Sequence, residues 1–220
     1  MHSISAVELL AREAGALALS HFKALGSVSV ESKGHLDLVT AADQDVERFL
    51  TEGLVKIFPN DGIFGEEGAA HQGNSGRTWV IDPIDGTFNF VRGGDQWAIS
   101  IGLYESAQPI FGVIFVPLRE QLLVGGVGLQ STLNGELIAQ RSGLDTSRAS
   151  CGVGFHPIIP VDLRLETLRF VIQDAGMSFR CCGSATLSLI EVGLGQVDGY
   201  LGIGESVSYT HLRAHETQLH

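Results

Sequence analysis

The segment with the clearest chemical potential places two aspartates three residues apart after an apolar run, in Trp79-Val80-Ile81-Asp82-Pro83-Ile84-Asp85-Gly86-Thr87. The β-branched and aromatic residues at 78–81 are typical of a buried strand, and Pro83 cannot continue a sheet ladder. We therefore expect the chain to turn at Pro83, with Asp82 and Asp85 at the strand end. Both carboxylates could then point the same way toward one ligand.

The residues after these aspartates favour an anion as part of that ligand. Gly86 lets the backbone approach a ligand closely, and residues 87–90 can begin a helix whose first N–H groups would face it. Mg²⁺ prefers oxygen ligands and rarely takes all of them from protein, so carboxylates at this place suit Mg²⁺ bound together with a substrate phosphate. A turn in which the aspartates only cap the backbone is the alternative interpretation.

Two further acidic segments lie upstream. Gly65-Glu66-Glu67-Gly68 places adjacent acids between glycines, a pattern that on its own is usually a solvated loop. In Asp37-Leu38-Val39-Thr40-Ala41-Ala42-Asp43, Thr40 and Asp43 have the spacing of a capping box ahead of a helical run. Capping alone explains both residues, so neither segment establishes a site by itself.

Taken together, in this order and with these gaps, the segments resemble the inositol monophosphatase family of Mg²⁺-dependent phosphomonoesterases. The resemblance extends from Glu8 to Ser206 and is carried by Lys33, Asp37-Leu38-Val39-Thr40, Asp43, Gly65-Glu66-Glu67, Asp82-Pro83-Ile84-Asp85-Gly86-Thr87, Asn89-Phe90, Trp97-Ala98-Ile99-Ser100-Ile101-Gly102 and Gly183-Ser184-Ala185. It implies a Mg²⁺-dependent phosphatase that hydrolyses a small phosphomonoester, such as an inositol phosphate-like compound, a sugar phosphate or a nucleotide phosphate, with metal-activated water.

The resemblance also implies a set of metal ligands, position by position. Glu66, Asp82 and the backbone carbonyl of Ile84 match the ligands of a first Mg²⁺, and Asp82 and Asp85 match ligands of a second. Two cations would stabilise the attacking and leaving oxygens of an in-line displacement on phosphorus.

Catalytic roles follow from the same resemblance. Glu66 and Thr87 match the residues that orient and deprotonate the attacking water. Asp43 matches the acid that hydrogen-bonds the threonine, which is compatible with a capping role. Lys33 would be an electrostatic neighbour of the acidic cluster, and an exposed lysine without that role is the alternative.

Substrate contacts are implied as well. Asp85 and the N–H groups of Gly86 and Thr87 match groups that hold the phosphate and the substrate. Ala185, at the start of a predicted helix, matches a further backbone contact to the phosphate.

The chain departs from the family pattern at two positions. Gly202 stands where inositol-specific members carry a glutamate, so the resemblance does not fix inositol phosphate as the substrate. Tyr209 stands where the family has an aspartate that binds the second metal. A missing ligand leaves a second function open, a catalytically silent homologue that binds phosphate or metal.

The last residues, 208–220, carry three of the eight histidines and follow neither a helical nor an alternating apolar pattern. We expect these residues to be a non-native tail on a C-terminally truncated copy of the family. A histidine-rich metal-binding tail is the alternative.

Composition narrows the class of protein. A chain of 220 residues with 44% hydrophobic content can bury a substantial core, and its formal charge of −11 argues against a nucleic-acid polymer as partner. No apolar run approaches the roughly 20 residues that span a bilayer, and no secretory signal is visible, so we expect a cytoplasmic protein without membrane contact.

Cys151, Cys181 and Cys182 form no paired framework and are expected to be reduced. The resemblance leaves a homodimer open.

Periodicity predicts the elements. We expect a helix over 5–24 that begins with a capping box of Ser5 and Glu8, and a second helix over 41–57. Sequential strands, expected to pair antiparallel, are predicted at 62–64, 78–81, 97–104, 110–116 and 121–127. Further strands at 149–155, 178–181 and 197–201 alternate with helices at 162–174 and 184–194.

This order predicts an α/β (α+β) protein with two halves. Residues 1–145 would form an N-terminal α+β half with the metal and phosphate motifs, and residues 146–207 a partial C-terminal α/β half. The resemblance implies the same picture, a layered α/β/α/β/α sandwich of the inositol monophosphatase and sugar phosphatase type with the site between the halves.

Overall fold

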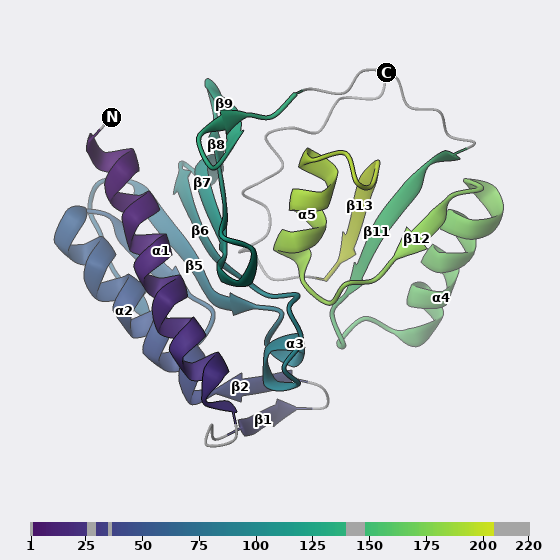
Figure 1. Ribbon diagram of the computed structural model, residues 1–220, viewed down its shortest axis with the longest axis horizontal. Helices are drawn as coiled ribbons and strands as arrows, with labels where there is room; N and C mark the ends of the chain where they lie inside the picture. The colour runs from purple at the N-terminus through teal and green to yellow at the C-terminus, as the bar shows by residue number, and fades with distance from the viewer. Residues whose placement is uncertain (1, 26–29, 35–36, 140–147, 205–220) are drawn as a thin grey trace.

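The computed structural model describes residues 2–25, 30–34, 37–139 and 148–204, which form five layers (Figure 1). Helices α1 (His2–Lys23) and α2 (Ala41–Ile57) cover one face of an eight-stranded sheet, and α5 (Ala185–Gly193) lies on its other face. A three-stranded sheet follows, and α4 (Val161–Arg169) covers its outer face. The predicted α/β/α/β/α sandwich is therefore confirmed. The described residues before 140 are called the first half below, and residues 148–204 the second half.

The large sheet has the strand order β10-β9-β8-β7-β6-β5-β3-β4 and is antiparallel except where β3 pairs with β5. Its strands are β3 (Gly62–Gly65), β4 (Ala70–His71), β5 (Arg77–Asp85), β6 (Ala98–Glu105), β7 (Gln108–Val116), β8 (Gln121–Gly126), β9 (Leu129–Leu133) and β10 (Glu136–Leu137). Strands β1 (Val30–Gly34) and β2 (Asp37–Thr40) form a separate hairpin. The five predicted strands of this region are present, but the predicted antiparallel pairing is wrong for β3 and β5, which are parallel. Strands β1, β2, β4, β9 and β10 were not predicted, because they are short and carry little apolar alternation.

Apolar side chains at helical spacing hold α1 and α2 against the sheet. Leu10 and Ala14 of α1 and Leu50 and Leu54 of α2 are buried in one core cluster, which also contains Trp79 of β5. The prediction for α2 is confirmed at both ends. Helix α1 begins at His2, three residues before Ser5, so the predicted capping box at its start is wrong.

Strand β5 continues through Pro83 to Asp85, so the predicted turn at Pro83 is also wrong. Its register against β6 shifts between Asp82, which faces Ser100, and Asp85, which faces Ala98. Pro83 lies inside this bulge, where the ladder is interrupted and the N–H that proline lacks is not needed.

The bulge decides where the two aspartates point. In a regular strand, residues three apart lie on opposite faces of the sheet. Here three steps along β5 are matched by only two along β6, so Asp82 and Asp85 emerge on the same face.

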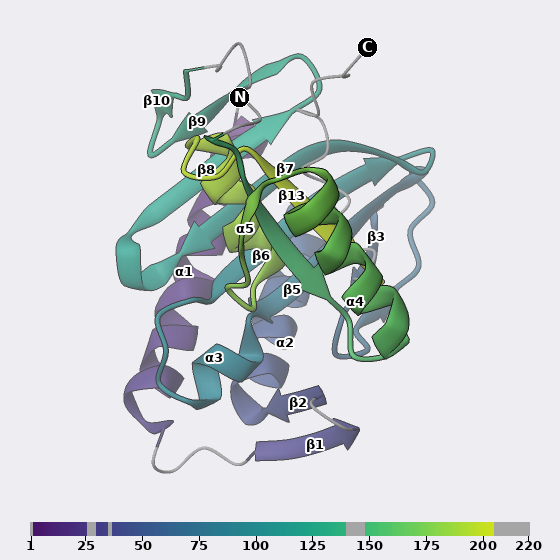
Figure 2. The ribbon, with the colours of Figure 1, turned by 90° about the vertical axis from the view of Figure 1, so that its right-hand side faces the viewer.

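The second half is a parallel α/β unit. Its strands β11 (Ser150–Phe155), β12 (Ser178–Arg180) and β13 (Gly199–Ile203) have the order β12-β11-β13, and both pairings are parallel. Helix α4, continued by the π-helical turn η4 (Phe170–Asp174), connects β11 to β12, and α5 connects β12 to β13. Figure 2, in which this half faces the viewer, shows α4 as its outermost element. All three strands point their carboxyl ends to one edge.

Two predictions fall outside the described residues. The expected boundary between residues 145 and 146 lies in the segment 140–147, and the expected tail 208–220 with Tyr209 lies beyond residue 204. The division into domains therefore remains a prediction. Among the described helices, none has both the length and the apolar character needed to cross a bilayer.

Candidate active site

Asp82 and Asp85 lie at the carboxyl end of β5 and are almost completely buried, with 1% and 4% of their surface exposed. The Oδ1 atom of Asp82 accepts a hydrogen bond from the N–H of Ile84 at 3.1 Å, across the bulge. The structure thus brings the two predicted carboxylates to one face and places the predicted backbone ligand, Ile84, between them.

Gly86 makes the transition from β5 to the short helix α3 (Thr87–Val91). Its φ of 95° lies in the left-handed region, and a Cβ atom at this position would lie 2.5 Å from the carbonyl oxygen of Gln96. Both the backbone conformation and the close approach require glycine. The predicted helix at residues 87–90 is confirmed.

Glu66 directly follows β3, the parallel neighbour of β5, and its carboxyl group shares a hydrogen bond with Asp82. Burial raises the pKa of Glu66 to about 7, the bond to Asp82 opposes this increase, and repulsion from Asp85, Glu67 and Asp43 adds to it. Carboxyl groups that repel one another when ionised are therefore gathered at the ends of β3 and β5.

Thr87 connects this acidic cluster to α2. Its Oγ1 atom lies 3.2 Å from Oδ1 of Asp43 and 3.0 Å from the carbonyl oxygen of Ile84. The hydroxyl has one proton and donates to one of these acceptors at a time. The contact between Thr87 and Asp43, which the family resemblance implied, is present.

Asp85 also forms the connection to the second half. Its Oδ2 atom accepts hydrogen bonds from Oγ of Ser184 at 2.5 Å, from the N–H of Thr186 at 2.8 Å and from the Thr186 hydroxyl. Ser184 is the N-cap of α5, because its Oγ accepts the N–H of Leu187 at 3.2 Å. The carboxylate of Asp85 thus lies at the positive end of the α5 dipole, beside the residue Ala185 that was expected to contact phosphate.

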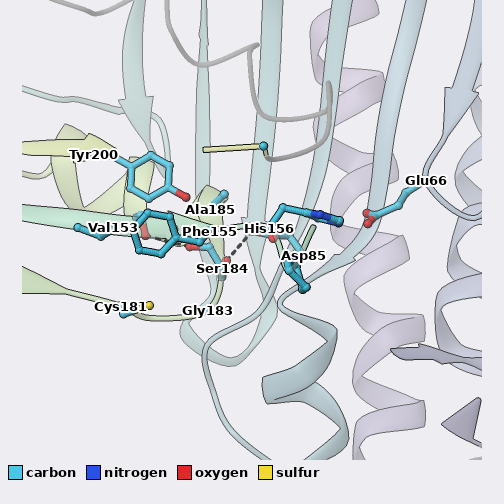
Figure 3. Close-up of a pocket in the computed structure, with 14 residues that line it drawn as sticks. Glu66, Asp85, Val153, Phe155, His156, Cys181, Gly183, Ser184, Ala185 and Tyr200 are labelled. Carbon is cyan, nitrogen blue, oxygen red and sulfur yellow. Dashed lines mark hydrogen bonds between the residues drawn. The ribbon is translucent and has the colours of Figure 1, made fainter. Parts of the chain in front are cut away.

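A cavity of about 300 Å³ opens between the two halves (Figure 3). The first half contributes Glu66 and Asp85 to its lining. The second half contributes Val153, Gly154, Phe155, His156, Pro157, Cys181, Gly183, Ser184, Ala185, Ser188, Tyr200 and Gly204. Acidic groups therefore face a wall of small, aromatic and imidazole side chains.

Most of this wall was missed in the sequence. His156, Cys181 and Gly204 each directly follow the carboxyl end of a parallel strand, namely β11, β12 and β13. Ligands of open parallel sheets bind at that edge, so recognition of a parallel sheet would have identified these positions. The alternation of strands and helices in residues 149–201 is the signal that could have indicated parallel pairing.

The described residues include no group of three or more Asp, Glu, His or Cys side chains arranged to enclose a metal ion. Glu66 and Asp82 are paired with each other, and Oδ2 of Asp85 is directed at α5. The chemistry of the donors nevertheless fits Mg²⁺, because the ligands are hard oxygens, their charges repel one another, and Mg²⁺ normally completes its shell with water and substrate oxygens. The structure does not describe the side chain of Lys33, so its predicted place beside the acidic cluster stays a prediction.

Comparison with known proteins agrees with this geometry. The profile of the inositol monophosphatase family matches residues 2–211. The chain belongs to the inositol monophosphatase family. It is therefore a phosphatase that hydrolyses phosphoric monoesters, and the family is in general metal-dependent.

Among relatives, a protein of Xylella fastidiosa named Nus factor SuhB is 34% identical over 199 residues, which cover 90% of this chain and 72% of the relative. A fructose-1,6-bisphosphatase/inositol-1-monophosphatase of Aquifex aeolicus is 29% identical over 200 residues, 90% of this chain and 75% of the relative.

Solved structures show the same fold. The inositol monophosphatase of Thermotoga maritima superimposes with a TM-score of 0.78 and 31% identity, covering 92% of this chain and 76% of that one. The extragenic suppressor protein SuhB of Bartonella henselae reaches a TM-score of 0.89 at 24% identity, covering 96% and 82%, and supports the fold alone.

Proposed function

We propose that this chain hydrolyses a small phosphomonoester in a Mg²⁺-dependent reaction at the cavity between its halves. The observation that carries the proposal is the convergence of Glu66, Asp82 and Asp85 at the ends of β3 and β5, where Asp82 and Asp85 are buried and repulsion from Asp85 helps to raise the pKa of Glu66. A divalent cation would relieve this repulsion. Glu66, Asp82, Asp85 and the carbonyl of Ile84 would hold the metal. A bound divalent cation supplies Lewis-acid activation of water and neutralises phosphate charge.

The residues of the chain then have separate tasks. Glu66 and Thr87 would orient the attacking water, and Glu66 would accept its proton. Asp43 would fix the direction of the Thr87 hydroxyl through their hydrogen bond. The N–H groups of Gly86, Thr87 and Ala185 would hold phosphate oxygens.

The second half would recognise the remainder of the substrate. The Nδ1 atom of His156 accepts the N–H of Ile158 at 3.2 Å, which leaves its Nε2 atom as a donor for a ligand. In Figure 3 the imidazole points toward Glu66, and both residues line the cavity. His156 would thus donate to a substrate oxygen, while Phe155 and Tyr200 offer apolar surface to a ring. The cavity volume suits a sugar, polyol or nucleotide monophosphate.

The test is release of inorganic phosphate from p-nitrophenyl phosphate, inositol 1-phosphate and fructose 1,6-bisphosphate, with Mg²⁺ and with a chelator. We expect turnover with Mg²⁺, loss of turnover with the chelator and recovery after Mg²⁺ is restored. Asp61→Asn is a matched control, because Asp61 is a buried carboxylate that bonds only Arg77 and Trp79 among the contacts described, outside the cavity.

Two results would contradict the proposal in different ways. Equal turnover in the chelator would remove the Mg²⁺ requirement. Binding of phosphate and Mg²⁺ without release of phosphate from any ester would favour the catalytically silent homologue.

We also propose a cytoplasmic location. All three cysteines are free, Cys151 buried, Cys182 half-buried and Cys181 exposed, which is typical of a reducing compartment. Labelling of Cys181 in intact cells with a permeant and an impermeant thiol reagent would test the location.

A further inference from the structure

Glu47 on α2 is a buried acid to which neither the family resemblance nor the cavity assigns a role. Only 4% of its surface is exposed. Its Oε2 atom accepts the N–H of Glu67 at 2.7 Å, and its Oε1 atom accepts the N–H of Ala69 at 2.8 Å. One carboxyl group therefore binds both ends of the short segment that follows Glu66.

The backbone at Glu66 is hydrogen-bonded on two sides, to β5 and to Glu47. Its own N–H donates to the carbonyl of Ile81 in β5 at 3.3 Å, while the next N–H along the chain, that of Glu67, donates to Glu47. The segment is closed by a further bond, from the N–H of Gly65 to the carbonyl of Ala69 at 2.7 Å. The side chain of Glu66 leaves the backbone between these anchors, so they set its direction.

Gly65 shows how closely Glu47 approaches this segment. A Cβ atom at position 65 would collide with both carboxyl oxygens of Glu47. The collision would be with a side chain that two hydrogen bonds hold in place, so it could not be relieved without breaking them. The absence of a side chain at Gly65 is thus what allows Glu47 to reach the two N–H groups.

The chemistry of the two bonds requires a carboxyl group. Glutamine has the same shape but presents one acceptor oxygen and one NH₂ group, which would face an N–H donor. A buried N–H group that loses its acceptor is costly, so the segment would rearrange.

We propose that Glu47 is a positioning residue, which fixes the segment 65–69 through the N–H groups of Glu67 and Ala69 and so holds the Glu66 carboxylate in place for the divalent cation. This inference rests on the proposed function for the role of Glu66. Glu47 itself touches neither substrate nor reacting atoms.

The test uses Glu47→Gln and Gly65→Ala, which disturb the same contact from opposite sides. Two variants serve as matched controls: Glu52→Gln removes an exposed acid from the same helix, and Asp61→Asn replaces one acceptor oxygen of another buried acid by an NH₂ group. Amide hydrogen exchange in the metal-free protein reports the Glu67 and Ala69 N–H groups, and calorimetric titration with Mg²⁺ alone reports cation affinity.

We expect faster exchange at Glu67 and Ala69 in both test variants, and a Mg²⁺ dissociation constant raised by about 10- to 100-fold, as is typical when a residue that orients a metal ligand is changed. Both controls should keep the parent's exchange at these amides and its Mg²⁺ affinity, even though Asp61→Asn lowers the thermal midpoint.

Other outcomes overturn the inference. If the parent, Glu47→Gln and Gly65→Ala all bind Mg²⁺ equally well, the positioning role is wrong, whether or not amide exchange has increased. The proposed function would not be affected by that result. A parent chain that binds no Mg²⁺ contradicts the proposed function, and the inferred role fails with it. A weakening in Asp61→Asn as large as in Glu47→Gln would show that general loss of stability is the cause.

Discussion

The two halves of this protein differ in how deeply they are packed. Of the twelve largest fully buried side chains among the described residues, only Leu187 and Ile190 of α5 belong to the second half. None of the nine residues of α4, all of them described, is buried, and β12 is exposed along its whole length. The second half buries a small cluster of Cys151, Val153 and Val171, whereas the first half packs two helices on a broad sheet.

This difference matches a division of labour at the cavity. The acids proposed to bind the metal lie at the ends of β3 and β5, within the well-packed half, where a rigid scaffold can hold ligands to the accuracy that catalysis needs. The second half contributes strand-end residues such as His156 and the start of α5. Strand-end residues such as His156 can vary without disturbing the carboxylates, whereas the start of α5 is hydrogen-bonded to Asp85. We therefore assign metal chemistry to the first half and substrate recognition to the strand ends of the second.

Asp82→Asn is the substitution expected to have the largest effect. The amide keeps the shape but removes the charge that the cation requires. Because loss of a residue that only supports a metal ligand costs about 10- to 100-fold, loss of this ligand should lower Mg²⁺-dependent phosphate release by about 100-fold or more. If the variant turns over nearly as fast as the parent at saturating Mg²⁺, Asp82 is not a metal ligand, and the assignment of the metal chemistry to the first half is contradicted.

Packing itself can be compared with Leu50→Ala in α2 and Leu165→Ala in α4. Leu50 is completely buried and Leu165 is 58% exposed. We expect Leu50→Ala to lower the free energy of unfolding by about 2–5 kcal/mol, and Leu165→Ala to change it by no more than about 0.5 kcal/mol. Denaturant titration measures both. Similar losses for the two variants would show that something covers α4 in solution and that the halves are packed more evenly than this structure indicates.

Ser184→Ala tests the connection between the halves, and its effect should lie between those of Leu50→Ala and Leu165→Ala. The change removes the N-cap of α5 and one of the bonds to Asp85. The free energy of unfolding should fall by about 0.5–2 kcal/mol, the usual cost of losing such a cap. Thr186→Ala, which leaves the cap intact, is the matched comparison and should cost less in the same thermal melts. If Thr186→Ala costs more than Ser184→Ala, the hydrogen bond from the Thr186 hydroxyl to Asp85 contributes more to stability than the cap of α5 does.

The sequence was sufficient for the parts that local pattern determines. Apolar spacing predicted α2 at both ends. The family resemblance predicted Glu66, Asp82, Asp85 and Thr87 as site residues, and their roles stay predictions. The bulge at Pro83 was not predictable in the same way, because a proline that ends a strand and a proline inside a bulge have the same local sequence.

Contacts between residues far apart in the sequence could not be predicted from the sequence pattern either. Asp85 meets Ser184 and Thr186 across 99 and 101 residues, and no spacing rule connects them. Glu47 is 20 residues from Glu67, on a helix whose other acids are solvated or paired elsewhere. Its role depends on the exact approach of α2 to β3, which only the packed structure provides.

Calorimetric titration of Mg²⁺ into the parent chain, Glu66→Gln and His156→Ala tests the division of labour most directly. Glu66→Gln changes the first half and should weaken Mg²⁺ binding strongly. His156→Ala changes the second half and should keep the Mg²⁺ affinity of the parent while raising KM for the phosphate ester. If His156→Ala weakens Mg²⁺ binding as much as Glu66→Gln, or if Glu66→Gln leaves it unchanged, the metal site does not belong to the first half and the account is wrong.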